Sequence, residues 1–265
     1  MAVKPVPCFR TGRWHLAGIG SYFYRLPYSI FRKGRERQSL EGIHPLCYAG
    51  AVKKKVLYWL FDLDNTLYPK ASGLFDEIDD RINRYLHRYF GVSAASADGV
   101  RRDYFHRYGL TLVGLMKERD ADPDHYLEYV HRVKVERYLG PNARLKAVLE
   151  SLDAPKAIFT NGSRRHSLAV TGALGVRDAF AEVFDIASTG YIPKPDPLSY
   201  RTVLERLGVD GERVVLVEDL ERNLPPARDL GMRTVLVGGK GGEESADYVL
   251  GSPEEIPSIL PSLEG

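Results

Sequence analysis

Polar side chains that could bind a phosphate group and a metal ion follow short apolar runs at several places in this sequence. They are Asp62, Asp64, Thr160, Asn161, Gly162, Glu218 and Asp219, and Lys194 lies in a proline-rich segment between them. Each short apolar run is typical of a buried parallel strand. Because ligands of an open parallel sheet bind beyond the carboxyl ends of its strands, we expect these side chains to share one site.

Each residue type suits one part of a phosphoryl transfer. Carboxylates are suitable ligands for Mg²⁺, which also takes phosphate oxygens and waters. Asp62 could accept a phosphoryl group as a covalent nucleophile, and Asp64 could move protons from the same side of the extended segment. Lys194 could neutralise the transferring group, while Thr160 and the backbone N–H groups after it could hold phosphate oxygens.

Simpler interpretations exist for every one of these motifs taken alone. Asp62 and Asp64 could form a solvated turn, and Lys194 could be an ordinary surface residue. A calcium-binding loop is excluded, because Leu67 stands where that loop needs glycine and Gly73 stands where it needs glutamate. The order of the motifs, each at the end of an expected strand, favours the functional interpretation.

The elements that would position these residues alternate along the chain. Strands are expected at 56–61, 156–162, 214–219 and 234–237, and helices at 143–152, 164–175 and 196–208. The last of these helices should begin after Asp196 as N-cap, with Pro197 in its first turn, and end at Gly208. This alternation predicts an α/β fold in which helices cover both faces of a parallel sheet.

A segment without an obvious strand separates the first two expected strands. Its apolar spacing predicts helices at 73–91, 97–109, 111–120 and 122–140. We therefore expect a helical cap domain at 70–140, inserted after the first strand of a core domain at 53–69 and 141–265. Within the cap, Tyr104, His106 and Tyr108 are candidates to face the cleft and set specificity, although the two tyrosines could equally pack the cap.

The composition is that of a soluble globular protein. Of 265 residues, 44% are hydrophobic and 27% charged. The two cysteines, Cys8 and Cys47, offer no disulfide framework for the main body. No apolar run approaches the roughly 20 residues that span a bilayer, and no secretory signal is evident. A cytoplasmic location and no membrane partner are expected.

The first part of the chain differs from the rest in charge. Residues 1–55 hold 11 Lys and Arg against 2 Asp and Glu, which leaves 26 basic and 33 acidic residues for 56–265. Residues 1–52 also lack sustained periodicity and are interrupted by Pro and Gly, so they are predicted to be a poorly ordered basic extension that is dispensable, with Val52 as an alternative start. The competing interpretation is an arm that contacts nucleic acid or docks on the body, but it contains no recognisable binding fold.

Four motifs, FDLDNTLYP, IFTNG, PKPDP and VED, resemble the signatures of the haloacid dehalogenase-like superfamily over about 55–240. The resemblance implies a Rossmann-like sheet with a mobile cap after the first strand. It also implies roles for individual residues: Asp62 as nucleophile, Asp64 as general acid and then base, Thr160 and Lys194 as phosphate ligands, and Asp62, Asp64 and Asp219 as Mg²⁺ ligands. Where paired aspartates are common, this chain has Glu218 and Asp219, so Glu218 could act through a water.

Within the superfamily, DNTLYP, the segment 103–115 and IFTNG resemble the pyrimidine 5′-nucleotidase-like branch. The branch implies hydrolysis of a small phosphomonoester, with pyrimidine nucleoside 5′-monophosphates as first choice. A sugar phosphate, phosphoglycolate or a phosphomutase reaction remain alternatives. Asp64 argues against dehalogenase chemistry, which lacks the second carboxylate. The exact substrate and the oligomeric state stay open.

Overall fold

A computed structural model describes residues 55–239 and 244–264 and contains a six-stranded parallel sheet. The order across the sheet is β3-β2-β1-β4-β5-β6, and every neighbouring pair is parallel. The strands are β1 Tyr58–Phe61, β2 Lys156–Phe159, β3 Glu182–Phe184, β4 Val214–Glu218, β5 Arg233–Val237 and β6 Tyr248–Leu250. The predicted α/β fold is confirmed.

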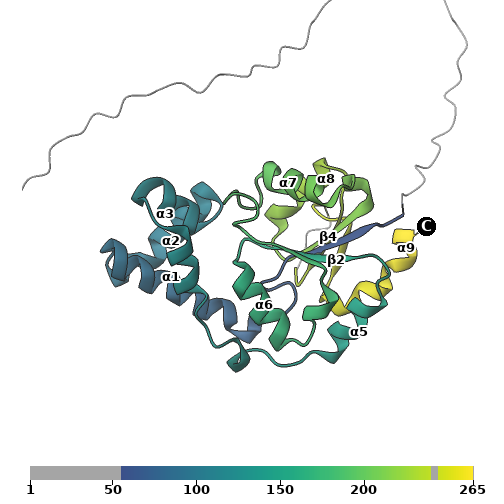
Figure 1. Ribbon diagram of the computed structural model, residues 1–265, viewed down its shortest axis with the longest axis horizontal. Helices are drawn as coiled ribbons and strands as arrows, with labels where there is room; N and C mark the ends of the chain where they lie inside the picture. Colours follow the sequence, from purple (N-terminus) through teal and green to yellow (C-terminus); the bar gives the residue numbers. More distant parts are fainter. Residues whose placement is uncertain (1–54, 240–243, 265) are drawn as a thin grey trace, which may run out of the picture. The chain divides into compact units, whose positions relative to one another are not determined.

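Alternate residues of the central strands face two separate apolar cores. Phe61 and Val217 belong to one core, and Leu60 and Leu216 to the other. Successive side chains of a strand point to opposite faces, so a strand with two apolar faces must be covered on both. In Figure 1, helices α5 and α6 lie on one side of the sheet and α7 and α8 on the other.

The helices that cover the sheet follow the insertion; the first three of those given next lie close to their predicted limits, and the last two were not predicted. They are α5 Ala143–Ser151, α6 Arg164–Ala173, α7 Pro197–Leu207, α8 Leu224–Asp229 and α9 Leu260–Glu264. The Asp196 side chain accepts a hydrogen bond from the Leu198 N–H at 2.9 Å, and Gly208 ends α7 with a φ of 65°. Both predicted ends of α7 are therefore confirmed.

The insertion after β1 is helical, as expected. It contains α1 Leu74–Phe90, α2 Ala94–Tyr108, α3 Thr111–Arg119 and α4 Pro123–Val130, which pack around their own apolar cluster. The expected limits of this cap (70–140), and those of the core (53–69 and 141–265), stay predictions.

The prediction of a single helix at 122–140 is wrong, because α4 ends at Val130 and a short 3-10 helix follows at Val135–Arg137. Val130 packs in the cap cluster, whereas Val135 and Leu139 pack in the core beneath the sheet. The apolar spacing is helical throughout, yet its residues serve two different cores, so the chain turns between them at His131.

Two strands, β3 and β6, were not expected from the sequence. Each has three residues, and they form the two edges of the sheet. Runs this short carry little periodicity.

The predicted basic extension and both cysteines lie outside the described residues. Among residues 55–239 and 244–264, no helix is both long enough and apolar enough to cross a membrane.

Candidate active site

The predicted site residues meet in one cavity at the carboxyl ends of β1, β2 and β4. Its volume is about 450 Å³. It is lined by all of the candidates, namely Asp62, Asp64, Thr160, Asn161, Gly162, Lys194, Glu218 and Asp219. Cap residues, among them Phe75 and Arg101, form the rest of the wall.

Lys194 lies between two carboxylates at the bottom of this cavity. Its side chain is 1% exposed, and its Nζ donates to Asp62 Oδ1 at 2.8 Å and to Glu218 Oε2 at 2.6 Å. Although burial alone would lower the pKa of Lys194, the two carboxylates raise it. Lys194 therefore stays a cation beside Asp62.

Glu218 is occupied by donors from the protein on both of its oxygens. Oε2 accepts from Lys194, and Oε1 accepts from the backbone N–H groups of Asp219 and Leu220, each at 3.2 Å. Glu218 thus holds the lysine and the turn after β4. Its contact with a metal, direct or through water, stays a prediction.

Asp62, Glu218 and Asp219 form an acidic group whose candidate ligand oxygens lie within 4.8 Å of one another. Burial and Glu218 raise the pKa of Asp62 to about 7, against the lowering effect of Lys194. Burial, Asp62 and Glu218 raise the pKa of Asp219 to about 9. One lysine does not balance three crowded carboxylates, and hard oxygen donors of this kind fit a divalent cation such as Mg²⁺.

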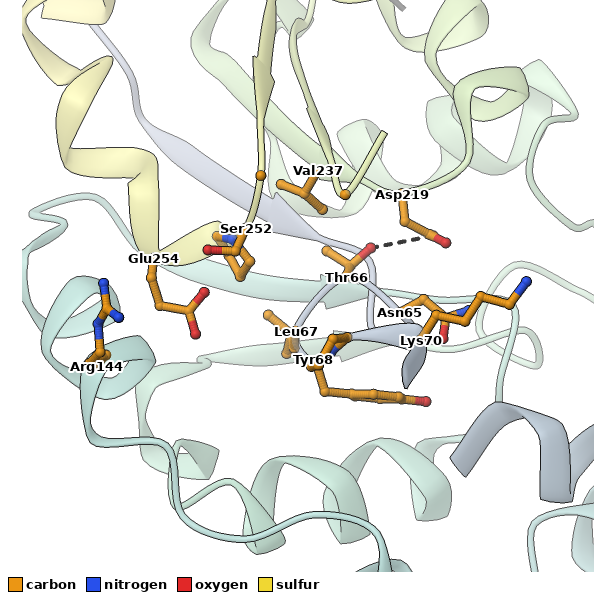
Figure 2. Close-up of a pocket in the computed structure, with 14 residues that line it drawn as sticks. Asn65, Thr66, Leu67, Tyr68, Lys70, Arg144, Asp219, Val237, Ser252 and Glu254 are labelled. Carbon is orange, nitrogen blue, oxygen red and sulfur yellow. Dashed lines mark hydrogen bonds between the residues drawn. The ribbon is translucent and has the colours of Figure 1, made fainter. Parts of the chain in front are cut away.

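Thr66 links two members of this acidic group. Its hydroxyl lies 3.0 Å from Asp62 Oδ2 and 3.5 Å from Asp219 Oδ1. Figure 2 shows Thr66 pointing towards Asp219 from the loop after β1, with Asn65 and Lys70 beside it. This loop also borders a second cavity of about 550 Å³, on whose other side lie Val237, Ser252 and Glu254. Asp219 therefore lines both cavities.

The loop after β2 is fixed by its own hydrogen bonds. The Gly162 N–H donates to Thr160 Oγ1 at 3.0 Å. Asn161 donates through Nδ2 to the Lys194 carbonyl at 3.0 Å and accepts from the Lys194 N–H at 2.8 Å. Both ends of the Asn161 amide thus hold the Lys194 backbone, so this residue, predicted to bind substrate, joins two loops of the site.

Asp64 has neighbours that the sequence did not reveal. Its Oδ1 lies 2.7 Å from His166 Nε2 and also accepts from the Tyr68 hydroxyl. Burial raises the pKa of Asp64, but His166 and Tyr68 lower it by more, so the net shift is downward. Tyr68 stands four residues after Asp64, a spacing that could have suggested the contact, whereas His166 is 102 residues away.

His131 stacks on His166 where α4 ends. The ring centroids are 4.6 Å apart with an angle of 11° between planes, and His131 Nδ1 lies 2.8 Å from the Ser163 hydroxyl. Burial and His166 lower the pKa of His131 to about 3, so its ring is neutral at physiological pH. The sequence put His131 inside a continuous helix and gave no sign of this role.

The expected cap residues separate into two groups. His106 lines the cavity, together with Arg101, Arg102 and Phe105. Tyr104 is buried in the cap cluster, and the Tyr108 hydroxyl donates to Glu118 at 2.6 Å. Tyr104 therefore packs the cap, as the alternative expectation states. Tyr108 does not line the cavity that contains Asp62, but it borders a neighbouring cavity together with His106.

Comparisons with known proteins agree with the fold and the motifs. A family model described as haloacid dehalogenase-like hydrolase matches residues 59–231. The chain is 26% identical over 198 residues to Phosphate metabolism protein 8 of Saccharomyces cerevisiae, covering 69% of this chain and 61% of that protein. It thus spans less than two thirds of the yeast relative's length.

Two further matches extend over nearly the whole length of the matched protein. The Phosphorylated carbohydrates phosphatase of Thermotoga maritima is 28% identical over 213 residues, covering 76% of this chain and 96% of that protein. A solved HAD phosphatase from Thermococcus onnurineus matches with a TM-score of 0.52 at 22% identity, over 78% of this chain and 98% of that one, which shows a shared fold. From the family model, the fold and the motifs together, this chain belongs to the haloacid dehalogenase-like hydrolases.

Proposed function

We propose that this protein is a Mg²⁺-dependent phosphomonoester hydrolase that works through an aspartyl-phosphate on Asp62, and that its substrates are pyrimidine nucleoside 5′-monophosphates. The observation that carries the proposal is the meeting of Asp62, Asp64, Thr160 and Lys194 in one cavity beside Asp219. A nucleophile, a proton-transfer group, hydrogen-bond donors for phosphate oxygens and a metal ligand are then within reach of one phosphate.

The chemistry has two displacements. In the first, an Asp62 carboxylate oxygen bonds to phosphorus while the ester P–O bond breaks, and Asp64, which enters this step with a proton on its carboxyl group, gives that proton to the leaving oxygen. In the second, Asp64 takes a proton from a water that bonds to phosphorus, and the bond from phosphorus to Asp62 breaks. Inorganic phosphate leaves, Asp62 is again a carboxylate, and Asp64 again carries a proton.

The chain's own groups stabilise the charge that moves in these steps. Lys194, held by Glu218, lies beside Asp62 and can neutralise the phosphoryl oxygens. Thr160 and the N–H groups of its loop can donate to the same oxygens. Asp62 and Asp219 would hold Mg²⁺ through their side chains, and Asp64 through its backbone carbonyl. A bound Mg²⁺ would supply further charge neutralisation and orient the phosphate.

The substrate class is supported by the branch motifs and by the cavity wall. Apolar side chains such as Phe75, Phe105 and Leu110 could contact a base, and Arg101 and His106 offer hydrogen-bond donors. A volume of about 450 Å³ suits a small metabolite. We further propose that the cap, at 70–140, selects the substrate and that the reaction takes place in the cytoplasm.

A phosphorylated sugar is the second candidate. It is favoured by the name of the Thermotoga maritima relative, Phosphorylated carbohydrates phosphatase. For both candidate substrates, Asp64 argues against dehalogenation, because that reaction needs no second carboxylate to protonate a leaving oxygen.

The test is a phosphate-release screen with Mg²⁺ over pyrimidine and purine nucleoside 5′-monophosphates, sugar phosphates and phosphoglycolate. We expect the highest kcat/KM for UMP or CMP, loss of activity with chelator, and no turnover in Asp62→Asn, whose amide cannot accept the phosphoryl group. Preference for a sugar phosphate would support the second candidate. Exchange of phosphate position without release would indicate a phosphomutase, and full activity of Asp62→Asn would overturn the mechanism.

A further inference from the structure

We infer that His166 and Tyr68 are positioning residues that hold Asp64 by one carboxylate oxygen and leave the other oxygen for proton transfer, an inference that rests on the proposed function. The two residues come from different parts of the chain. Tyr68 follows β1 in the loop that carries Asp64, and His166 lies in the first turn of α6.

Both donors converge on the same oxygen. His166 Nε2 lies 2.7 Å from Asp64 Oδ1, and the Tyr68 hydroxyl donates to that oxygen as well. The Nδ1 atom of His166 has no hydrogen-bond partner among the described residues. Within that part of the chain, the imidazole ring therefore hydrogen-bonds only to Asp64, through Nε2. Both rings are almost fully buried, with 1% exposure for His166 and 3% for Tyr68.

The second oxygen of Asp64 faces the loop that would hold phosphate. A Cβ atom added to Gly162 would lie 3.6 Å from Asp64 Oδ2 and 3.3 Å from Thr160 Oγ1. Oδ2 and the Thr160 hydroxyl, which is proposed to bind phosphate oxygens, therefore border the same space beside Gly162. Because two donors hold Oδ1, rotation of the carboxylate is restricted and Oδ2 stays beside this position.

The His166 ring is itself held in place. His131 stacks on it, and the Ser163 hydroxyl contacts His131 Nδ1 at 2.8 Å and accepts from the His166 N–H at 3.3 Å. Since His131 stands at the end of α4, the contact joins the exit of the cap to the residue that holds Asp64. A supporting group fixed in this way can keep Asp64 within the narrow range of positions that proton transfer requires.

The kinetic test compares His166→Phe, His166→Gln and Tyr68→Phe with the parent chain. Phe keeps a ring without a donor, and Gln brings an amide N–H near the position of Nε2. A His87→Gln chain serves as control, because His87 lies on the exposed side of α1. The value of kcat/KM is measured with Mg²⁺ for UMP, phenyl phosphate and 4-nitrophenyl phosphate, which differ in how much the leaving oxygen needs a proton.

We expect His166→Phe to lower kcat/KM for UMP by about 10- to 100-fold, a part of what general acid catalysis supplies, and to lower it by less than about threefold for 4-nitrophenyl phosphate. Tyr68→Phe should show the same trend more weakly, and His166→Gln should recover most of the loss. KM should change little. Equal losses for all three esters, or no loss in either Phe chain, would overturn the inference.

A measurement without substrate covers the case in which His166→Phe does not fold. In the NMR spectrum of the parent chain, the imidazole Nε2–H of His166 should give a hydrogen-bonded proton signal that moves in Asp64→Ala and stays in His87→Gln. Absence of the signal, or no response to Asp64→Ala, would refute the contact. A parent chain that hydrolyses none of the esters refutes the proposed function and the catalytic part of this inference, even where the NMR contact is present.

Discussion

At the scale of single residues, the site holds more negative charge than its own cation balances. Lys194 contacts Asp62 and Glu218, but no described lysine or arginine forms an ion pair with Asp219. Crowded carboxylates of this kind destabilise a fold unless a ligand compensates them, and such arrangements are found at functional sites. The acidic group should therefore reduce stability in the absence of metal.

This charge balance predicts a distinct pH dependence for the metal-free protein. A carboxyl whose pKa in the folded state is raised binds its proton more tightly there than in the unfolded state, whose pKa is near 4. With folded-state values of about 7 for Asp62 and about 9 for Asp219, their contribution to the free energy of unfolding should fall as pH rises from about 4 to about 9.

The variant Asp219→Asn removes one of these charges. We expect it to raise the thermal midpoint of the metal-free protein at pH 8 and to reduce the decrease in the free energy of unfolding as pH rises. It should also abolish the stabilisation that Mg²⁺ gives the parent chain. Thermal unfolding followed by circular dichroism, with and without Mg²⁺, checks this. The control is Asp229→Asn at the exposed end of α8, which should keep the Mg²⁺ response. An undiminished Mg²⁺ shift in Asp219→Asn would contradict the assignment of this ligand.

At the scale of elements, the cap depends on close packing between α2 and α3. Gly114 of α3 is buried, and a Cβ atom added to it would lie 2.6 Å from Tyr104 Cγ and 2.8 Å from Tyr104 Cβ. Gly99 of α2 is exposed and has nothing within 4 Å of that position. Because Gly114 has no side chain, Tyr104 can pack directly against α3.

These two glycines provide a matched pair of substitutions. Gly99→Ala should raise the free energy of unfolding by up to about 1 kcal/mol, because alanine is the better helix former. Gly114→Ala gains the same helical preference but forces Tyr104 to move, and overpacking should give a net loss of about 1–3 kcal/mol. Urea unfolding of both chains measures the difference. A Gly114→Ala chain as stable as Gly99→Ala would mean that the α2–α3 contact is looser than described.

At the scale of the whole molecule, the catalytic body and the first part of the chain carry opposite charge. The body, 56–265, has 26 basic and 33 acidic residues, whereas 1–55 has 11 basic and 2 acidic residues. The central strand β1 begins at Tyr58, and the Leu57 N–H already donates to the Arg213 carbonyl at 2.8 Å. The sheet and the site are therefore built from residues after the basic segment.

A chain that starts at Val52 should keep the stability and activity of the full chain. We expect the thermal midpoint to agree within about 2 °C, because the described sheet and cavity are built from residues after Leu57. The turnover number for UMP should agree as well. Thermal unfolding and phosphate release on both chains provide the test. A clear fall in either quantity would show that the basic segment acts together with the body.

Local patterns in the sequence were sufficient to predict four of the six strands, the helical insertion and the candidate residues that meet in the cavity. Asp62, Thr160 and Asp219 each follow a short apolar run, and parallel strands bring their carboxyl ends to one edge whatever the distance along the chain. Periodicity within each segment was sufficient for this, because strand and helix formation depend on the spacing of nearby residues.

The surroundings of Asp64 and the end of α4 became evident only from the packing of the folded chain. His166 reaches Asp64 across 102 residues, and no local spacing encodes such a contact. His131 and the end of α4 were missed because Val130 and Val135 continue one helical pattern while packing in different cores. Which core an apolar residue joins, and which oxygen a buried histidine contacts, depends on how separate elements pack together, and that information is absent from any single segment.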